Sequence, residues 1–225
     1  MSASLPKSPT EDTAELKRVW SQLALLSCPR FYNFHMHTIF SDGKLEPIQL
    51  IEQAINIGLK GLAITDHHSV SASLFVKNYL TARDYLDLPF FWTGLEITAQ
   101  LIDLEVHILA YGFSPTHEAL IPYLQGEKAQ GGVAMISRVI ENIHAAGGLA
   151  VLAHPARYNY PVEELIAACS KLGIDGVETF YAYDNPKPWR SSVKETELVI
   201  DLTKKYNLFN TCGTDSHGLS LLQRI

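Results

Sequence analysis

The stretch FYNFHMHTIFSDG, residues 31–43, opens a series in which short apolar runs alternate with amphipathic segments. Residues 31–37 have the composition of a strand, and residues 47–56 follow with a proline at the start and isoleucines at helical spacing. The same alternation continues to the end of the chain. It predicts an α/β fold with a mainly parallel sheet, which is either open or closed into a barrel.

Further strands are expected at residues 61–65, 149–153, 176–180 and 209–213, and further helices at 70–85, 127–146, 163–172 and 193–206. Residues 90–98 and 105–113 are β-rich and are expected to pair antiparallel. Residues 13–26 repeat apolar side chains at helical spacing, after a polar tail. We therefore expect an N-terminal tail and helix over residues 1–30 and one domain over residues 31–225.

The composition fits a globular protein, because 47% of the 225 residues are hydrophobic and 19% are charged. A net charge of −6 argues against stable binding of duplex nucleic acid or of an anionic membrane. Three widely spaced cysteines, no secretory signal and no membrane-length apolar run lead us to expect a cytoplasmic protein without disulfides. The oligomeric state stays open.

Imidazole and carboxylate side chains gather at the C-terminal ends of the predicted strands, the edge where sites of parallel α/β folds are built. His35 and His37 alternate along one strand, so both imidazoles face the same way. The other motifs are Ser41-Asp42-Gly43, Thr65-Asp66-His67, Gly94-Leu95-Glu96, the strand residue His107, Ala153-His154-Pro155 and Asp215-Ser216-His217.

Six histidines, two aspartates and one glutamate in such positions predict a metal centre. A single strand histidine is usually structural, but burying the whole set without a metal would be costly. Nitrogen and carboxylate ligands together suit Zn²⁺, Mn²⁺ or Fe. Nine ligands exceed the needs of one ion, so the pattern favours two or three divalent cations.

These motifs resemble those of the PHP family, named for polymerase and histidinol phosphatase, from His35 to Gly218. The resemblance implies a distorted (β/α)7 TIM-like barrel, a centre of two or three metal ions and phosphoester hydrolysis. Ala153-His154-Pro155-Ala156-Arg157-Tyr158 looks closest to stand-alone phosphatases that act on nucleoside mono- or bisphosphates and short oligonucleotides. Carried over onto this sequence, the implied metal ligands are His35, His37, Asp42, His67, Glu96, His107, His154, Asp215 and His217.

The resulting hypothesis is a hydrolase of phosphoric ester bonds, a phosphatase or phosphodiesterase that attacks a small phosphorylated substrate with a metal-bridged hydroxide. Glu96 would bridge metals, and Asp42 or Asp215 would accept the proton of the water. Asp66 either orients a ligand histidine or makes a core hydrogen bond. The candidate phosphate contacts are Arg157, Lys187, Arg190 and His68.

Three alternatives are weighed against this hypothesis. A 3′–5′ exonuclease acting on short oligonucleotides is disfavoured by the acidic balance of the chain. A non-catalytic, regulatory metal-binding domain is disfavoured by the filled ligand set. A barrel hydrolase of C–N bonds would want a bridging lysine on a central strand and only one late aspartate. The pairing of Asp215 with His217, together with Glu96 and His107, does not fit that pattern.

Overall fold

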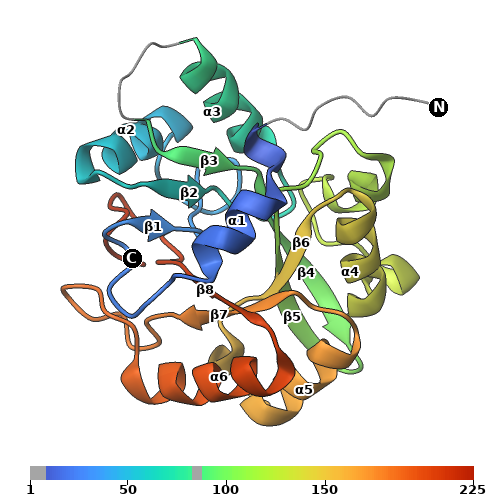
Figure 1. The fold of residues 1–225 in the computed structure, drawn as a ribbon. Helices are drawn as coiled ribbons and strands as arrows, with labels where there is room; N and C mark the ends of the chain where they lie inside the picture. The colour runs from blue at the N-terminus through green and yellow to red at the C-terminus, as the bar shows by residue number, and fades with distance from the viewer. Residues whose placement is uncertain (1–8, 83–87) are drawn as a thin grey trace.

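The computed structural model describes residues 9–82 and 88–225, and a ring of strands with helices around it organises them (Figure 1). A parallel three-stranded sheet has the order β1 (Tyr32–Asn33), β2 (Gly61–Ala63), β3 (Phe90–Trp92). A five-stranded sheet has the order β4 (Gly94–Leu101), β5 (Leu104–Tyr111), β6 (Leu149–Leu152), β7 (Gly176–Phe180), β8 (Phe209–Cys212). Only β5 runs antiparallel to both of its neighbours.

The two sheets close into one barrel. Only Thr93 separates β3 from β4, so the two form one bent strand and the ring has seven members. A parallel bridge between Met36 and Ser216 joins the first strand to the last, and a second bridge joins His67 to Glu96. The expected seven-stranded TIM-like barrel is confirmed, and the antiparallel β5 together with the bend at Thr93 makes it a distorted one.

Two glycines allow the strands to approach closely where the ring is tight. A Cβ at Gly94 would lie 2.3 Å from the carbonyl oxygen of Ile64, on the neighbouring strand. A Cβ at Gly213 would lie 2.1 Å from the Cβ of His35. Neither distance is possible for a real side chain, so both positions require glycine.

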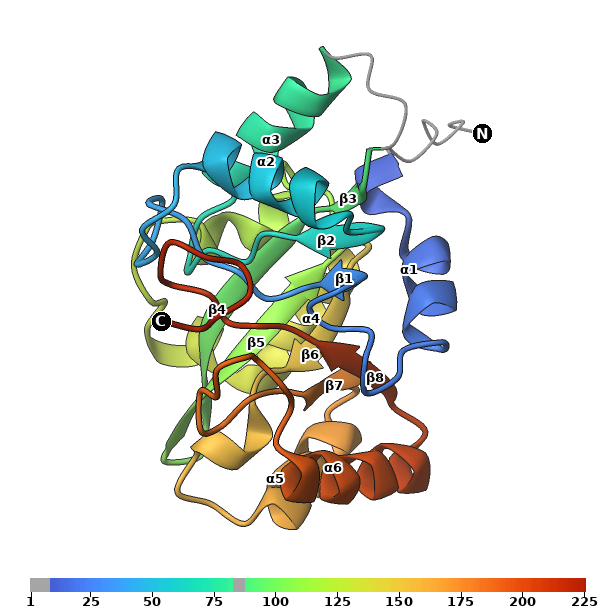
Figure 2. The same ribbon diagram turned by 90° about the vertical axis from the view of Figure 1, so that its left-hand side faces the viewer.

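Five helices cover the outside of the barrel, and their apolar faces pack on the strands (Figures 1 and 2). They are α2 (Pro47–Ile57), α3 (Ser71–Thr81), α4 (Ile136–Ala145), α5 (Val162–Lys171) and α6 (Val193–Tyr206). Short 3₁₀ turns occupy Pro9–Glu11, Glu118–Tyr123, Gly131–Ala134 and Pro155–Arg157. Because α2, α3 and α6 each follow a parallel strand, they begin at the end of the barrel where those strands finish.

Helix α1 (Thr13–Trp20) lies across the other end of the barrel, opposite the C-terminus of the chain (Figure 2). Asp12 caps it by accepting a hydrogen bond from the Glu15 backbone, 3.0 Å away. Trp20 is buried edge-on against Tyr111 and Phe34. The helix thereby closes the N-terminal end of the strand ring with apolar side chains.

Several predicted elements are shorter than the sequence suggests. The helix expected over residues 127–146 is wrong in its first half, where residues 127–130 are not helical and Gly131–Ala134 is a 3₁₀ turn. Two consecutive glycines there weaken helix formation. The helix expected over 13–26 ends at Trp20, and part of the one expected over 70–85 falls outside the described residues.

The cysteines Cys28, Cys169 and Cys212 are buried and unpaired, as expected. Among the helices of the described residues, none has the length and apolar character needed to cross a bilayer.

Candidate metal centre

The nine residues singled out in the sequence meet at the end of the barrel away from α1. Eight of them form three overlapping groups, in each of which the potential ligand atoms lie within 4.8 Å of one another. The groups are His37–Asp42–His67–His217, His35–His37–Glu96–Asp215 and His67–Glu96–His107. The ninth, His154, places Nε2 at 3.4 Å from Glu96 Oε1. Residues separated by up to 182 positions in the chain thus share one small volume.

Glu96 lies at the middle of this cluster and is only 1% exposed. Its Oε2 lies 2.9 Å from His35 Nε2 and 3.1 Å from His37 Nε2. Its Oε1 lies 2.8 Å from His107 Nδ1. The two oxygens therefore face two different groups, which is the geometry that a bridging carboxylate needs.

Asp215 divides its two oxygens between the histidines and a set of donors. Oδ1 lies 3.2 Å from His37 Nε2 and 3.3 Å from His35 Nε2. Oδ2 accepts hydrogen bonds from Tyr181, at 2.7 Å, and from Arg157 and Arg224, each at 2.9 Å. These three donors hold the carboxylate in place while Oδ1 stays directed at the cluster.

Asp42 forms the open side of the centre, with a side chain that is 54% exposed. Its Oδ2 lies 3.1 Å from His217 Nε2 and 3.8 Å from His67 Nε2. The loop that carries Asp42 is held by Asp66, which accepts hydrogen bonds from the Thr38 backbone and hydroxyl at 2.6 Å each. Asp66 therefore makes core hydrogen bonds. It reaches a ligand imidazole only through Ser41, whose hydroxyl lies 2.8 Å from Asp66 Oδ1 and 3.4 Å from His37 Nδ1.

The orienting carboxylate belongs instead to Glu178, which sequence reasoning missed. Glu178 is fully buried on β7, with Oε1 at 2.9 Å from His35 Nδ1. Its Oε2 accepts the backbone N–H of His154 at 2.9 Å, where His154 has a positive φ of 28°. A lone glutamate inside the apolar run GVETF was the available signal, because an unpaired charge would not be buried there.

The electrostatics of the cluster favour ionised carboxylates. Burial alone would raise the pKa of Glu96 and of Asp215, but the surrounding imidazoles, His35 first, hold both pKa values well below their usual range. Burial lowers the pKa of His67 to about 4. Burial also opposes the charge on His37, yet Asp215 and Glu96 raise its pKa to about 9. A protonated His37 therefore offsets the negative charge of Asp215 and Glu96, and a bound cation would take over that role.

Several buried ligand atoms lack any hydrogen-bond partner, although they lie close to one another. They are His37 Nε2, Glu96 Oε1, His107 Nδ1, and both ring nitrogens of His154. Such atoms are costly to bury unsatisfied. Since ring nitrogens of His37, His107 and His154 face the Glu96 carboxylate without hydrogen-bond geometry, the site fits divalent cations, and the mixed nitrogen and carboxylate donors fit a transition metal.

The candidate phosphate contacts fall into two sets. Arg157 lies in the centre, bonded to Asp215 and to Tyr181. His68 is buried next to His67 and places Nε2 at 3.1 Å from the Thr98 hydroxyl. Lys187 and Arg190 lie exposed in the loop after β7, where Arg190 lines a separate cavity with Tyr183. The geometry therefore joins Arg157 to the cluster, whereas the His68 ring lies 6.2 Å from that of His67 and binds Thr98. Sequence reasoning missed Arg224, the second arginine on Asp215.

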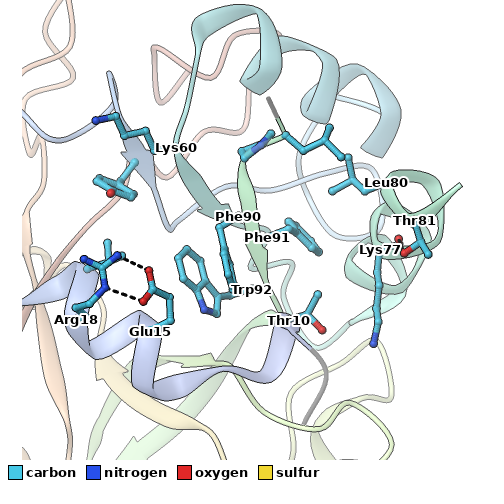
Figure 3. Close-up of a pocket in the computed structure, with 14 residues that line it drawn as sticks. Thr10, Glu15, Arg18, Lys60, Lys77, Leu80, Thr81, Phe90, Phe91 and Trp92 are labelled. Atoms are coloured by element: carbon cyan, nitrogen blue, oxygen red, sulfur yellow. Dashed lines mark hydrogen bonds and ion pairs between the residues drawn. The ribbon is translucent and has the colours of Figure 1, made fainter. Parts of the chain in front are cut away.

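A separate cavity of about 600 Å³ lies between α1, β3 and α3, at the end of the barrel opposite the candidate metal centre (Figure 3). Its lining includes Phe90, Trp92, Lys60 and the ion pair of Arg18 with Glu15. None of the nine candidate ligands lines it.

Residues 33–217 match the family model described as the PHP domain. A 5′-3′ exoribonuclease of Haemophilus influenzae is 23% identical in an alignment that is 256 residues long with its gaps. The alignment covers 83% of this chain and 89% of that protein. Two solved structures share the fold. One, assigned as a metal-dependent phosphoesterase from Bifidobacterium adolescentis, has a TM-score of 0.67 and 21% identity and covers 84% of this chain and 88% of that one. The other, described as an amidohydrolase from Chromobacterium violaceum with bound sulfate and no metal, has a TM-score of 0.68 and 20% identity and covers 83% and 87%.

Proposed function

Since this chain belongs to the PHP domain family and is a metal-dependent phosphoesterase, we propose that it hydrolyses a small phosphorylated substrate at the cluster of nine ligands. The observation that carries this proposal is the convergence of three ligand groups on Glu96 and its neighbours. The end of a barrel at which its parallel strands finish is also where enzymes of this architecture place their chemistry.

We propose that the three groups hold two or three divalent cations, with Mn, Zn or Fe as the candidates for this donor set. When bound, such ions lower the pKa of a water toward neutrality and offset the charge that develops on phosphoryl oxygens. Glu96 would be shared between groups, since its two oxygens face different histidines.

The chain's own residues would prepare the attacking water and the phosphate. Asp42 is ionised at neutral pH, because the imidazoles of His217 and its neighbours outweigh burial and lower its pKa. Its half-exposed carboxylate can accept a proton from a water at the open side of the centre. Asp215 is the alternative acceptor, although Arg157 and Tyr181 already occupy Oδ2.

Arg157 is the best-supported phosphate contact. Its guanidinium is partly exposed and lies against Asp215, so free N–H groups can reach an oxygen of the substrate. His68, Lys187 and Arg190 remain proposed contacts, the last two as a further anion contact from the loop after β7.

We propose a nucleotide as the substrate and expect no stable binding of duplex nucleic acid, because the chain is acidic. A second candidate is exonucleolytic cleavage of short RNA from the 5′ end. The relative in H. influenzae favours it, since the alignment spans most of both proteins. Both reactions break a phosphoester bond with the same residues.

We also propose that residues 31–225 form the catalytic domain and that residues 1–30 add the helix that closes its far end. Buried, unpaired thiols at Cys28, Cys169 and Cys212 support a reducing compartment such as the cytoplasm.

The test begins with metal analysis of the purified protein and phosphate release from an aryl phosphate, with Mn²⁺ and with a chelator. We expect bound metal, activity with Mn²⁺ and loss of activity on full chelation. His154→Ala should remove turnover, whereas His117→Ala, a change outside the cluster, should retain it. Full activity of the metal-free protein would refute the mechanism.

A further inference from the structure

A small apolar slot lies beside the metal centre, between the loop that carries Asp42 and the helices α2 and α3. We call it the rim slot. Its volume is about 350 Å³. It is lined by Phe40, Glu46, Pro47, Ile48, Gln49 and Phe75.

The rim slot exposes aromatic surface that globular proteins normally bury. Phe40 is 44% exposed and Phe75 is 46% exposed, and Ile48 beside them is also exposed. Among the ring contacts of the described residues, none joins Phe40 to Phe75. The two rings therefore border one space without filling it, and a flat apolar ligand could enter there.

The position of Phe40 is tied to the metal centre. Its backbone N–H donates to the Thr38 hydroxyl at 3.2 Å, and that hydroxyl donates to Asp66, the residue before His67. Phe40 also precedes Asp42 by two residues, so their Cα atoms are at most about 7 Å apart. One wall of the slot is thus fixed two residues from Asp42, a candidate ligand.

The charge of the lining decides which part of a substrate can enter. Among the described residues that line it, Glu46 is the only charged one, and none is a lysine or an arginine. The Glu46 backbone N–H donates to Gln49 Oε1 at 3.1 Å, so part of the polar edge is already satisfied internally. The slot disfavours a phosphate, which a metal-loaded centre would attract, and favours a neutral ring.

We propose that the rim slot binds the nucleobase of a nucleotide substrate whose phosphate lies at the metal centre. This inference rests on the proposed function and names the residues that would recognise the base. The ribose then spans from the centre to the slot. Because aromatic rings stack on every base, the slot would be tolerant of base identity.

The experiment compares adenosine 5′-monophosphate with ribose 5-phosphate, which carries the same phosphate on the same sugar but has no base. KM is measured for both with the Mn²⁺-loaded wild type and with Phe75→Ala, Phe75→Trp and Phe31→Ala. Phe31 is the matched control, since it is 45% exposed but precedes β1 at the opposite end of the barrel. Calorimetry of adenosine 5′-monophosphate binding is run in parallel.

In the wild type we expect a KM about tenfold lower for the nucleotide than for the sugar phosphate, as stacking of one base would give. Phe75→Ala should remove most of this preference, Phe75→Trp should restore it, and Phe31→Ala should keep it. A preference that survives in Phe75→Ala would overturn the slot while leaving the phosphoesterase intact.

Two further outcomes separate this inference from the proposed function. If neither ester is hydrolysed, the substrate proposal fails, and calorimetry alone decides the slot: equal binding of the nucleotide by wild type and Phe75→Ala would overturn it. If light scattering shows a dimer that Phe75→Ala dissociates, the slot is a subunit interface and the nucleobase inference is wrong.

Discussion

Replacing Glu178 by glutamine should weaken metal binding more than any other change of a residue that is not itself a candidate ligand. Glu178 Oε1 lies 2.9 Å from His35 Nδ1, and Oε2 accepts the His154 N–H. A glutamine that keeps its oxygen on the His154 N–H must turn its NH₂ group toward His35 Nδ1. His35 Nδ1 then has to accept, so the proton moves to Nε2, the nitrogen that faces Glu96 and Asp215.

The magnitude follows from that change of tautomer. A protonated Nε2 cannot act as a metal ligand, and the lost charged hydrogen bond is worth about 1.5–3 kcal/mol. This corresponds to a loss of about 10- to 100-fold in metal affinity, the range found for residues that orient ligand histidines. Turnover at limiting metal should fall by a similar factor.

The assay is calorimetric titration of chelator-treated protein with Zn²⁺ or Mn²⁺, with thermal unfolding as a check on the fold. Glu164→Gln, an exposed glutamate of α5, is the matched control and should bind metal like the wild type. Wild-type metal affinity in a folded Glu178→Gln protein would refute the role assigned to this carboxylate.

Three further predictions concern stability. Trp20→Ala should destabilise the protein by about 3–5 kcal/mol in urea unfolding, because a fully packed indole against Tyr111 is lost; a change below about 1 kcal/mol would show that α1 is not needed to close the barrel. Metal at about 100 times its Kd should stabilise the fold by about 2.7 kcal/mol, and a chelator should remove this gain; an unchanged Tm would argue against the centre. His144 donates to Asp175 across 2.7 Å, which raises its pKa above the ordinary 6.5, so its stabilisation is complete below pH 6.5 and is lost as the pH rises through the raised value. His144→Gln should therefore cost up to about 1 kcal/mol at pH 6 and nothing at pH 9, and an equal cost at both values would contradict the linkage.

The sequence by itself determined the fold class and the identity of the candidate ligands. Period-two and helical patterns mark where each parallel strand ends, and histidine or carboxylate residues stand at those ends. Because parallel strands finish at one edge of the ring, His35, Glu96, His154 and His217 could be expected to meet, and the structure brings them together.

Only the tertiary structure decided which residues hold those ligands in place. Glu178 meets His35 across 143 positions and Arg224 reaches Asp215 from beyond the last strand, contacts that depend on strand order and register. The sequence around Asp66 was compatible with two roles. In the structure Asp66 binds Thr38 and Ser41 of the loop that carries Asp42, and it meets His37 only through Ser41. Local periodicity places a side chain on a face of its own element, but its partners depend on which elements lie next to it, and that is set by packing of the whole chain.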